Sequence, residues 1–203
     1  MTDENVTTVV LASASASRRR MLSAAGVNIL AQAARVDEEE VKNSMQAAGM
    51  EAGEVAEALA ELKAQRISPQ FHDAIVLGAD QMLAVDGEWL DKPADADALR
   101  DHLKKLRGRS HRLISCVVAV KNGARIWHQT DTATITMRPC SDAFIDWYVD
   151  RAGDSVLDSV GGYQLEGLGA QLFSHVQGDF FTVLGMPLLP LLDFLRLQGV
   201  LRT

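Results

Sequence analysis

The stretch VVLASASASRRRMLSAAG, residues 9–26, contains a strand, a turn and a helix in that order. VVLA at 9–12 is apolar and β-branched, which is typical of a short buried strand. The letters after the serine-rich turn predict a helix from about Ala16 to Ala25, which Gly26 ends. A strand that leads directly into a helix is typical of an α/β fold.

The rest of the chain continues this alternation. Asp86-Gly87 and Asn122-Gly123 are typical of two-residue hairpin turns, so the strands beside each of them are expected to pair antiparallel. Strands are predicted at 27–36, 74–80, 82–85, 88–90, 111–121 and 124–137, and helices at 51–67, 94–107, 141–151 and from Pro187 onwards. Residues 152–186 are rich in glycine and too irregular to assign. The pattern predicts one α/β domain over residues 1–203, with a mixed, partly antiparallel sheet flanked by helices and a polar tail at 1–8.

Composition and charge exclude two classes of protein. The chain has 203 residues, 47% apolar and 23% charged, which excludes an intrinsically disordered protein. Its 20 basic and 27 acidic side chains give a formal net charge of −7. Binding nucleic acid through overall charge requires clustered positive charge, so no nucleic-acid partner is expected. A few well-placed cations can still bind a small anion such as a nucleotide.

The cysteines and the first residues bear on the compartment. Cys116 and Cys140 are too few for a disulfide scaffold, and neither belongs to a CxxC pair. The first eight residues, MTDENVTT, are acidic and polar, unlike a secretory or mitochondrial leader. No apolar run reaches the ~18–20 residues of a membrane span. The sequence therefore predicts a cytoplasmic protein with reduced thiols and no membrane partner.

The turn between the first strand and helix is a candidate anion site. Ser13, Ser15 and Arg18 lie at a helix N-terminus, where free N–H groups and the helix dipole attract anions. Serine hydroxyls donate hydrogen bonds, and the guanidinium fork fits a phosphate. The same letters also fit a serine N-cap followed by solvated arginines, so both interpretations stay open.

Acidic and basic side chains elsewhere could complete such a site. Asp80 is the last residue of the buried strand at 74–80, and the end of a strand is a frequent site position in α/β folds. The cluster 37–40 supplies further carboxylates. Separated carboxylates can hold a divalent cation, or one can bind the metal while another deprotonates water. A solvated loop at 37–40 and a turn or cap role for Asp80 are the structural alternatives. Lys63 and Lys92 are isolated lysines that could bind phosphate or lie on the surface.

In this order and spacing, the motifs resemble those of the Maf family of nucleoside triphosphate pyrophosphatases. The resemblance covers residues 9–197 and rests on the segments Leu11–Leu22, Val36–Glu38, Leu59–Ala64, Gly78–Gln81, Lys92-Pro93, Gly108–His111, GGYQLEG from Gly161 and VLGMPL from Val183. Family members cleave the α–β phosphoanhydride of a nucleotide, using a divalent cation (Mg²⁺ or Mn²⁺), and release a monophosphate and pyrophosphate. Their fold resembles the inosine triphosphate pyrophosphatases, with two lobes around a cleft, and they are often homodimers.

The resemblance also implies a role for each candidate residue. Ser13, Ser15, Arg18 and Lys63 would bind the phosphates of the substrate, and Lys92 with Lys63 would neutralise charge on the leaving pyrophosphate. Glu38 and Asp80 would hold the metal, and Asp80 would be the base that activates water.

Three further positions bear on the base. In the pyrimidine branch of the family they are Arg, Thr and Gln, whereas in the branch acting on 7-methyl-GTP they are aromatic, Gln and Glu. Here they are Ser17, Gln81 and Glu166, so two of three side with 7-methyl-GTP. A carboxylate suits the N1–H and N2–H₂ donors of guanine. Ser17 departs from both branches, because it can neither stack on a cationic ring nor form an arginine contact.

Other functions remain open at this point. The same chemistry on dTTP or UTP is one, which Gln81 and Glu166 argue against. A second is a non-catalytic regulator of septum formation or cell division, and a third is a nucleotidyltransferase that forms a conjugate instead of free monophosphate. The combination of Glu38, Lys63, Asp80 and Lys92 favours an enzyme, because a purely binding protein needs no base beside a phosphate loop.

Overall fold

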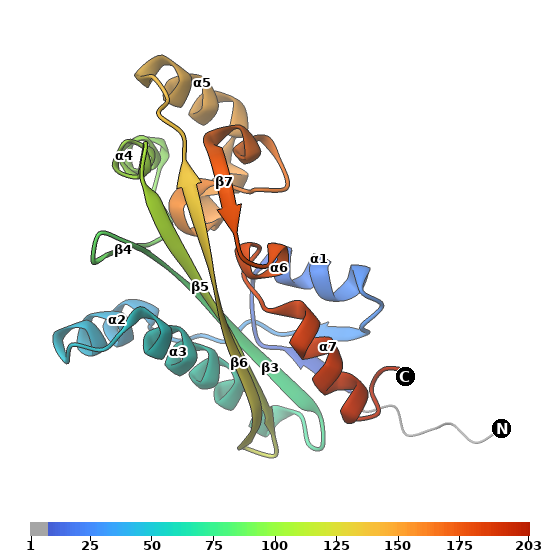
Figure 1. The fold of residues 1–203 in the computed structure, drawn as a ribbon. Coiled ribbons are helices and arrows are strands. Elements are labelled where there is room, and N and C mark those ends of the chain that lie inside the picture. Colours follow the sequence, from blue (N-terminus) through green and yellow to red (C-terminus); the bar gives the residue numbers. More distant parts are fainter. Residues whose placement is uncertain (1–7) are drawn as a thin grey trace.

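Three long strands form the centre of the sheet in the computed structural model, which describes residues 8–203 (Figure 1). They are β3 (Ile75–Val85), β5 (Ser110–Lys121) and β6 (Ala124–Met137), and they pair antiparallel. Shorter strands complete a seven-stranded sheet of order β2-β1-β3-β5-β6-β7, in which β4 also pairs with β3. Because β1 runs parallel to both β2 and β3, the sheet is mixed, as the sequence predicted. The shorter strands are β1 (Val9–Leu11), β2 (Ile29–Ala31), β4 (Glu88–Leu90) and β7 (Phe173–Gln177).

Helices cover both faces of the sheet, which confirms the predicted fold class. In Figure 1, α2 and α3 lie on one side of the long strands, α1 and α7 on the other, and α4 and α5 at their far end. The helices are α1 (Ala16–Ala24), α2 (Glu38–Ala47), α3 (Ala52–Ile67), α4 (Ala96–Leu106), α5 (Asp142–Ala152), α6 (Phe180–Val183) and α7 (Leu188–Leu197). Short 3₁₀ turns occur at Ser68–Gln70, Asp154–Asp158, Val160–Gly162 and Leu168–Leu172.

The buried apolar side chains form separate clusters that define two lobes. One cluster joins α4 and α5 to the far halves of the long strands and includes Leu99 and Tyr148. Two others lie on opposite faces of the near halves, one against α3 and one against α1 and α7. The lobes therefore share the long strands, which run continuously from one lobe into the other.

Two sequence predictions about strands were wrong in extent. The strand predicted at 27–36 is only β2, because its partner β1 ends at Leu11 and the chain beyond Ala31 has no strand to pair with. The segments 74–80 and 82–85 are one strand, β3, so Asp80 lies in the middle of a strand and not at its end.

Other elements were missed or lie outside the description. The acidic cluster 37–40 is not a solvated loop: Asp37 caps α2, and Glu38 to Glu40 form its first turn. Its low burial hid its periodicity, since none of its residues is fully buried. The unassigned segment 152–186 contains α6 and β7. The polar tail predicted at 1–8 lies, apart from Thr8, outside the described residues. Within 8–203, no helix has the length and apolar character needed to cross a bilayer.

Candidate active site

One edge of β3 has a gap in its strand pairing, and the candidate site lies along this gap. β1 pairs with residues 75–77 of this strand and β4 with residues 83–85, while β5 occupies the other edge. Residues 78–82 therefore have no strand partner on the free edge, and their backbone groups need other partners. Arg18 supplies one, since its Nη1 donates to the Ala79 carbonyl at 2.7 Å. Ligands in α/β sheets often bind where neighbouring strands diverge in this way.

A cleft of about 490 Å³ opens along this gap. It is lined by side chains from both lobes, which agrees with the predicted arrangement of two lobes around a cleft. All ten residues to which the resemblance assigns a role line it: Ser13, Ser15, Ser17, Arg18, Glu38, Lys63, Asp80, Gln81, Lys92 and Glu166. Residues as far apart in the chain as Ser13 and Glu166 thus share one cavity, although their individual roles stay predictions.

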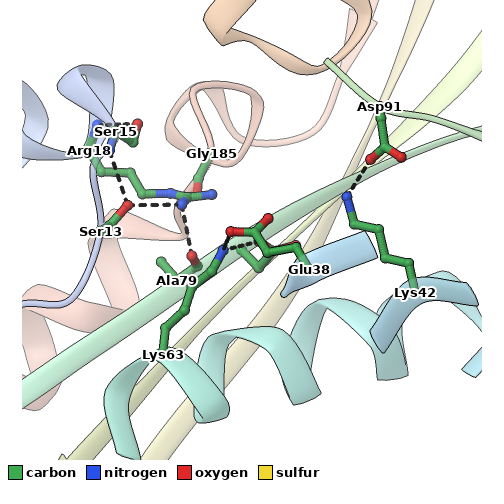
Figure 2. A network of polar contacts seen from close by, with 10 residues as sticks. Ser13, Ser15, Arg18, Glu38, Lys42, Lys63, Ala79, Asp91 and Gly185 are labelled. Atoms are coloured by element: carbon green, nitrogen blue, oxygen red, sulfur yellow. Dashed lines mark hydrogen bonds and ion pairs between the residues drawn. The ribbon is translucent and has the colours of Figure 1, made fainter. Parts of the chain in front are cut away.

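The serine-rich turn is both a helix cap and part of the cleft. Ser15 is the N-cap of α1, and its Oγ accepts a hydrogen bond from the Arg18 N–H at 3.3 Å. Ser13 Oγ accepts from Arg18 Nη1 at 3.3 Å. Arg18 Nε donates to the Gly185 carbonyl at 2.9 Å, so one guanidinium joins the turn, β3 and the segment after α6 (Figure 2). The alternative of a solvated arginine is wrong for Arg18, which is buried.

The burial of Arg18 has an electrostatic consequence. Removal from water lowers the pKa of its guanidinium, and the nearby carboxylates of Asp80 and Glu38 act in the opposite direction. Since an arginine stays protonated throughout the accessible pH range, the cleft keeps a fixed positive charge at this point. Fixed charge of this kind binds an anion without the cost of ordering a flexible side chain.

Lys63 connects two carboxylates from different elements. Its Nζ lies 2.6 Å from Asp80 Oδ1 on β3 and 2.8 Å from Glu38 Oε1 on α2. Lys63 and Asp80 are both buried. Figure 2 shows Lys63 extending from α3 toward Glu38. We call Glu38, Lys63, Asp80 and Lys92 the charged end of the cleft.

Gly78 determines how closely α3 approaches β3. A Cβ atom at this position would lie 1.9 Å from the Ala60 carbonyl oxygen and 2.8 Å from the Ala64 nitrogen, both in the backbone of α3. Only glycine permits this contact. Because Gly78 and Asp80 are two residues apart in a strand, they face the same side, and the contact brings Lys63 onto Asp80.

Lysines also set the charge state of Glu38. Burial alone would raise the pKa of this carboxyl group, but Lys63, followed by Lys42 and Lys92, outweighs it and holds the pKa below its ordinary value. Lys92 is exposed at the rim of the cleft. Lys42 lies one helical turn after Glu38 and forms an ion pair with Asp91 across the cleft (Figure 2).

The carboxylates of the charged end fit a divalent cation only together with a substrate. Asp80 Oδ2 is buried and has no hydrogen-bond partner among the described residues. This oxygen is therefore available to a cation, and the carboxylate of Glu38 contacts the same lysine, Lys63. No group of three or more His, Cys, Asp or Glu side chains within residues 8–203 could hold a metal by itself. Mg²⁺ commonly binds through one or two carboxylates plus substrate phosphates, which matches this donor set.

The opposite side of β3 forms the other end of the cleft. Gln81 faces away from Asp80, and its Nε2 donates to Ser115 Oγ at 3.0 Å and to the carbonyls of Thr182 and Val183 at 3.1 Å. Because three acceptors hold the nitrogen, Oε1 is the polar atom left for a ligand. We call this region, made of Ser17, Gln81, Glu166 and Gly185, the carbonyl end.

Ser17 and Glu166 lie at the outer side of the carbonyl end. Ser17 Oγ donates to the Leu184 carbonyl at 3.2 Å. Glu166 is exposed and lies 3.4 Å from Arg20 Nη2. Its carboxylate can therefore turn toward a ligand at small cost, because an exposed ion pair is weak.

Sequence reasoning missed several residues that build the cleft. Lys42 could have been found from its spacing to Glu38 if α2 had been predicted. Gly185 adopts a φ of +108°, and a Cβ there would lie 3.5 Å from Arg18 Nε, a contact that no local pattern reveals. His111, the last residue of the segment Gly108–His111, is buried, with its Nε2 at 2.6 Å from the Tyr163 hydroxyl.

Known proteins match the chain over nearly its whole length. The model of the family described as "Maf-like protein" matches residues 8–198. The chain belongs to the Maf family. A relative named nucleoside triphosphate pyrophosphatase, from Paramagnetospirillum magneticum, is 55% identical over 192 residues, which are 95% of this chain and 99% of the relative. Another, from Rhizobium meliloti, is named 7-methyl-GTP pyrophosphatase and is 45% identical over 95% of this chain and 97% of its own length.

Solved structures give a weaker match to this Maf protein. A nucleoside-triphosphatase, or dITP/XTP pyrophosphatase, from Mycobacterium abscessus superposes with a TM-score of 0.37 and 18% identity. The superposition covers 64% of this chain and 73% of the other.

Proposed function

We propose that this Maf protein hydrolyses the α–β phosphoanhydride of nucleoside triphosphates, and that modified guanine nucleotides such as 7-methyl-GTP are its preferred substrates. The general activity is that of an enzyme acting on acid anhydrides, and relatives at 49–55% identity are named for it. The observation that supports it most strongly is the buried contact of Lys63 with Asp80, beside an arginine fixed at the head of α1. A protein that only bound nucleotides would have no use for a buried carboxylate with one free oxygen.

The charged end accounts for the chemistry step by step. Water attacks the α phosphorus, the α–β anhydride bond breaks with pyrophosphate as the leaving group, and the proton from water passes to the carboxylate of Asp80. Lys63 holds Oδ1 and so fixes the orientation of the carboxylate. Arg18 binds the phosphates, and Lys92 reduces the charge that develops on the pyrophosphate as it leaves. Mg²⁺ or Mn²⁺, held by Glu38, Asp80 and phosphate oxygens, would supply further positive charge and a more acidic water.

The polar groups of the carbonyl end support the recognition of a guanine base. Gln81 presents an acceptor because its nitrogen is bound by Ser115 and two carbonyls, and Glu166 adds a carboxylate. Two acceptors match the donor pair N1–H and N2–H₂ on one edge of guanine, whereas uracil and thymine present a donor between two acceptors. A carboxylate also favours the positive charge of a 7-methylated ring.

A nucleotide panel tests this function. The protein is incubated with Mg²⁺ or Mn²⁺ and with GTP, 7-methyl-GTP, UTP or dTTP, and pyrophosphate, orthophosphate and monophosphate are measured separately. We expect pyrophosphate and monophosphate in equal amounts, no orthophosphate, and the highest kcat/KM with 7-methyl-GTP. Chelation of the metal should abolish the activity.

The other outcomes correspond to the competing functions. A preference for UTP or dTTP would contradict the assignment of the base, and a nucleotide conjugate in place of monophosphate would indicate a nucleotidyltransferase. No product from any nucleotide would favour a non-catalytic regulator of cell division. We further propose that the enzyme acts in the cytoplasm as a homodimer, which sedimentation and fractionation would test.

A further inference from the structure

A second cavity adjoins the carbonyl end of the cleft. Its volume is about 350 Å³, and its walls come from α1, from α6 and the residue after it, and from the start of α7. Apolar side chains make up most of the lining: Met21, Ala24, Ala25, Phe181, Leu184 and Leu188. We call this cavity the apolar pocket. None of the steps of the proposed reaction uses it.

The apolar pocket and the cleft share three lining residues. Ser17, Leu184 and Glu166 belong to both, so the two cavities meet where the base of a nucleotide would lie. Ser17 is small, and its hydroxyl is held against the Leu184 carbonyl at 3.2 Å. A side chain as small as that of Ser17 leaves this junction open.

The junction also has a polar rim. Arg20 and Glu166 line the apolar pocket and form an exposed ion pair at 3.4 Å. A few polar groups around an apolar cavity are typical of sites for small organic ligands, where the polar groups orient the ligand and the apolar walls bind it. Binding of Glu166 to the edge of a guanine would direct the rest of the ring system toward this rim.

We infer that the apolar pocket binds an apolar substituent carried on the base of the substrate, so that guanine nucleotides with bulky alkyl or aryl adducts are good substrates. The inference rests on the proposed function and extends its substrate class. Size permits it, because a cavity of about 150 Å³ already holds a benzene molecule. Affinity follows from burial, since each methylene or aromatic carbon removed from water favours the bound state.

Kinetics with adducted nucleotides test the inference. GTP, 7-methyl-GTP, N2-benzyl-GTP and 7-benzyl-GTP are compared, and pyrophosphate release gives KM and kcat for each. We expect the KM of at least one benzylated nucleotide to be about tenfold below that of 7-methyl-GTP, with kcat changed less than about threefold. Binding of the matching benzylated α,β-methylene analogue, measured by calorimetry, should show the same tenfold gain without any turnover.

A filled pocket provides the critical variant. Ala24→Phe places a ring in the apolar pocket from a residue that does not line the cleft. It should remove the tenfold gain for the benzylated nucleotide and leave the kinetics with GTP unchanged. Ala143→Phe, the same exchange at an exposed position of α5, is the matched control and should keep the gain.

The outcomes separate this inference from the function on which it rests. Hydrolysis of GTP without any gain for benzylated nucleotides, or a gain that survives Ala24→Phe, would overturn the inference alone. Absence of pyrophosphate release from every nucleotide would instead overturn the proposed function. If the parent shows no benzyl gain and Ala24→Phe lowers the sedimentation coefficient, the pocket is an interface between copies of the chain and the inference is wrong.

Discussion

The two ends of the cleft lie on opposite faces of one strand and are built by different means. At the charged end, Lys63 and Asp80 come from a long helix and a long strand that touch through Gly78. At the carbonyl end, Gln81 is held by two backbone carbonyls of the short helix α6 and by the Ser115 hydroxyl. The backbone contact between α3 and β3 holds the two charged side chains in place. Side chains on the short helix and the loops around it can change without moving the sheet. With this difference, one scaffold can keep the same reaction while the residues that contact the nucleobase change.

Removal of Asp80, the base that we propose at the charged end, should have the largest effect. We expect Asp80→Asn to lower kcat by about 10³-fold for every nucleotide, because the amide cannot take the proton from water. Nucleotide affinity, measured by calorimetry, should change little. Asp91→Asn is a control in the same cleft, paired with Lys42 at the rim, and should stay within about threefold of the parent. Near-parental turnover of Asp80→Asn would contradict its role as the base.

A variant that pushes α3 away from β3 tests whether the charged end depends on the contact between them. Gly78→Ala places a methyl group against the backbone of α3, and we expect a loss of about 3 kcal/mol in the free energy of unfolding. Turnover should fall as Lys63 moves from Asp80. Gly53→Ala, within α3 itself, meets only Ile114 Cγ2 at 3.8 Å and should gain about 1 kcal/mol. Urea titrations of both variants measure this, and equal stabilities would show that the close contact is unimportant.

A buried histidine offers a test of the segment that carries Glu166. Burial lowers the pKa of His111 to about 4, and its ring contacts Tyr163, three residues before Glu166. In the unfolded chain the imidazole binds a proton below about pH 6.5, whereas in the native protein it does so only below about pH 4. The free energy of unfolding therefore decreases as the pH is lowered from about 6.5 to about 4.

The size of this effect can be measured with one variant. We expect the parent to lose about 2 kcal/mol more than His111→Gln between pH 7 and pH 5, because each pKa unit corresponds to about 1.4 kcal/mol. Urea titrations at the two pH values give the difference. The same slope in both proteins would mean that His111 does not resist protonation in the fold.

Local patterns predicted the fold class and the residues of the cleft, and they failed where long-range contacts decide. The hairpins at Asp86-Gly87 and Asn122-Gly123 carry strong turn signals, and both are confirmed. Asp80 was placed at the end of a strand because the apolar run at 74–80 ends at this acidic residue. The strand instead continues to Val85, and Gly78 lies inside it, where the close approach of α3 requires a glycine.

The carbonyl end was the least predictable part. The order of Ser17, Gln81 and Glu166 in the motifs marked them as specificity positions, and all three line the cleft. The orientation of the Gln81 amide could not be predicted, because Thr182 and Val183 approach it from 101 and 102 residues away. The apolar pocket likewise arises only when α1, α6 and α7 pack together.

The most direct measurement compares one variant from each end on the same nucleotides. Values of kcat/KM are determined for the parent, Lys92→Ala and Glu166→Gln with GTP, 7-methyl-GTP, UTP and dTTP. Our account predicts that Lys92→Ala lowers all four by a similar factor, on the order of tenfold, because it acts on the phosphates. Glu166→Gln should instead raise the ratio of UTP to 7-methyl-GTP about tenfold, since an amide suits uracil and a carboxylate suits guanine. An unchanged ranking in Glu166→Gln, or a changed ranking in Lys92→Ala, would contradict the division between the two ends.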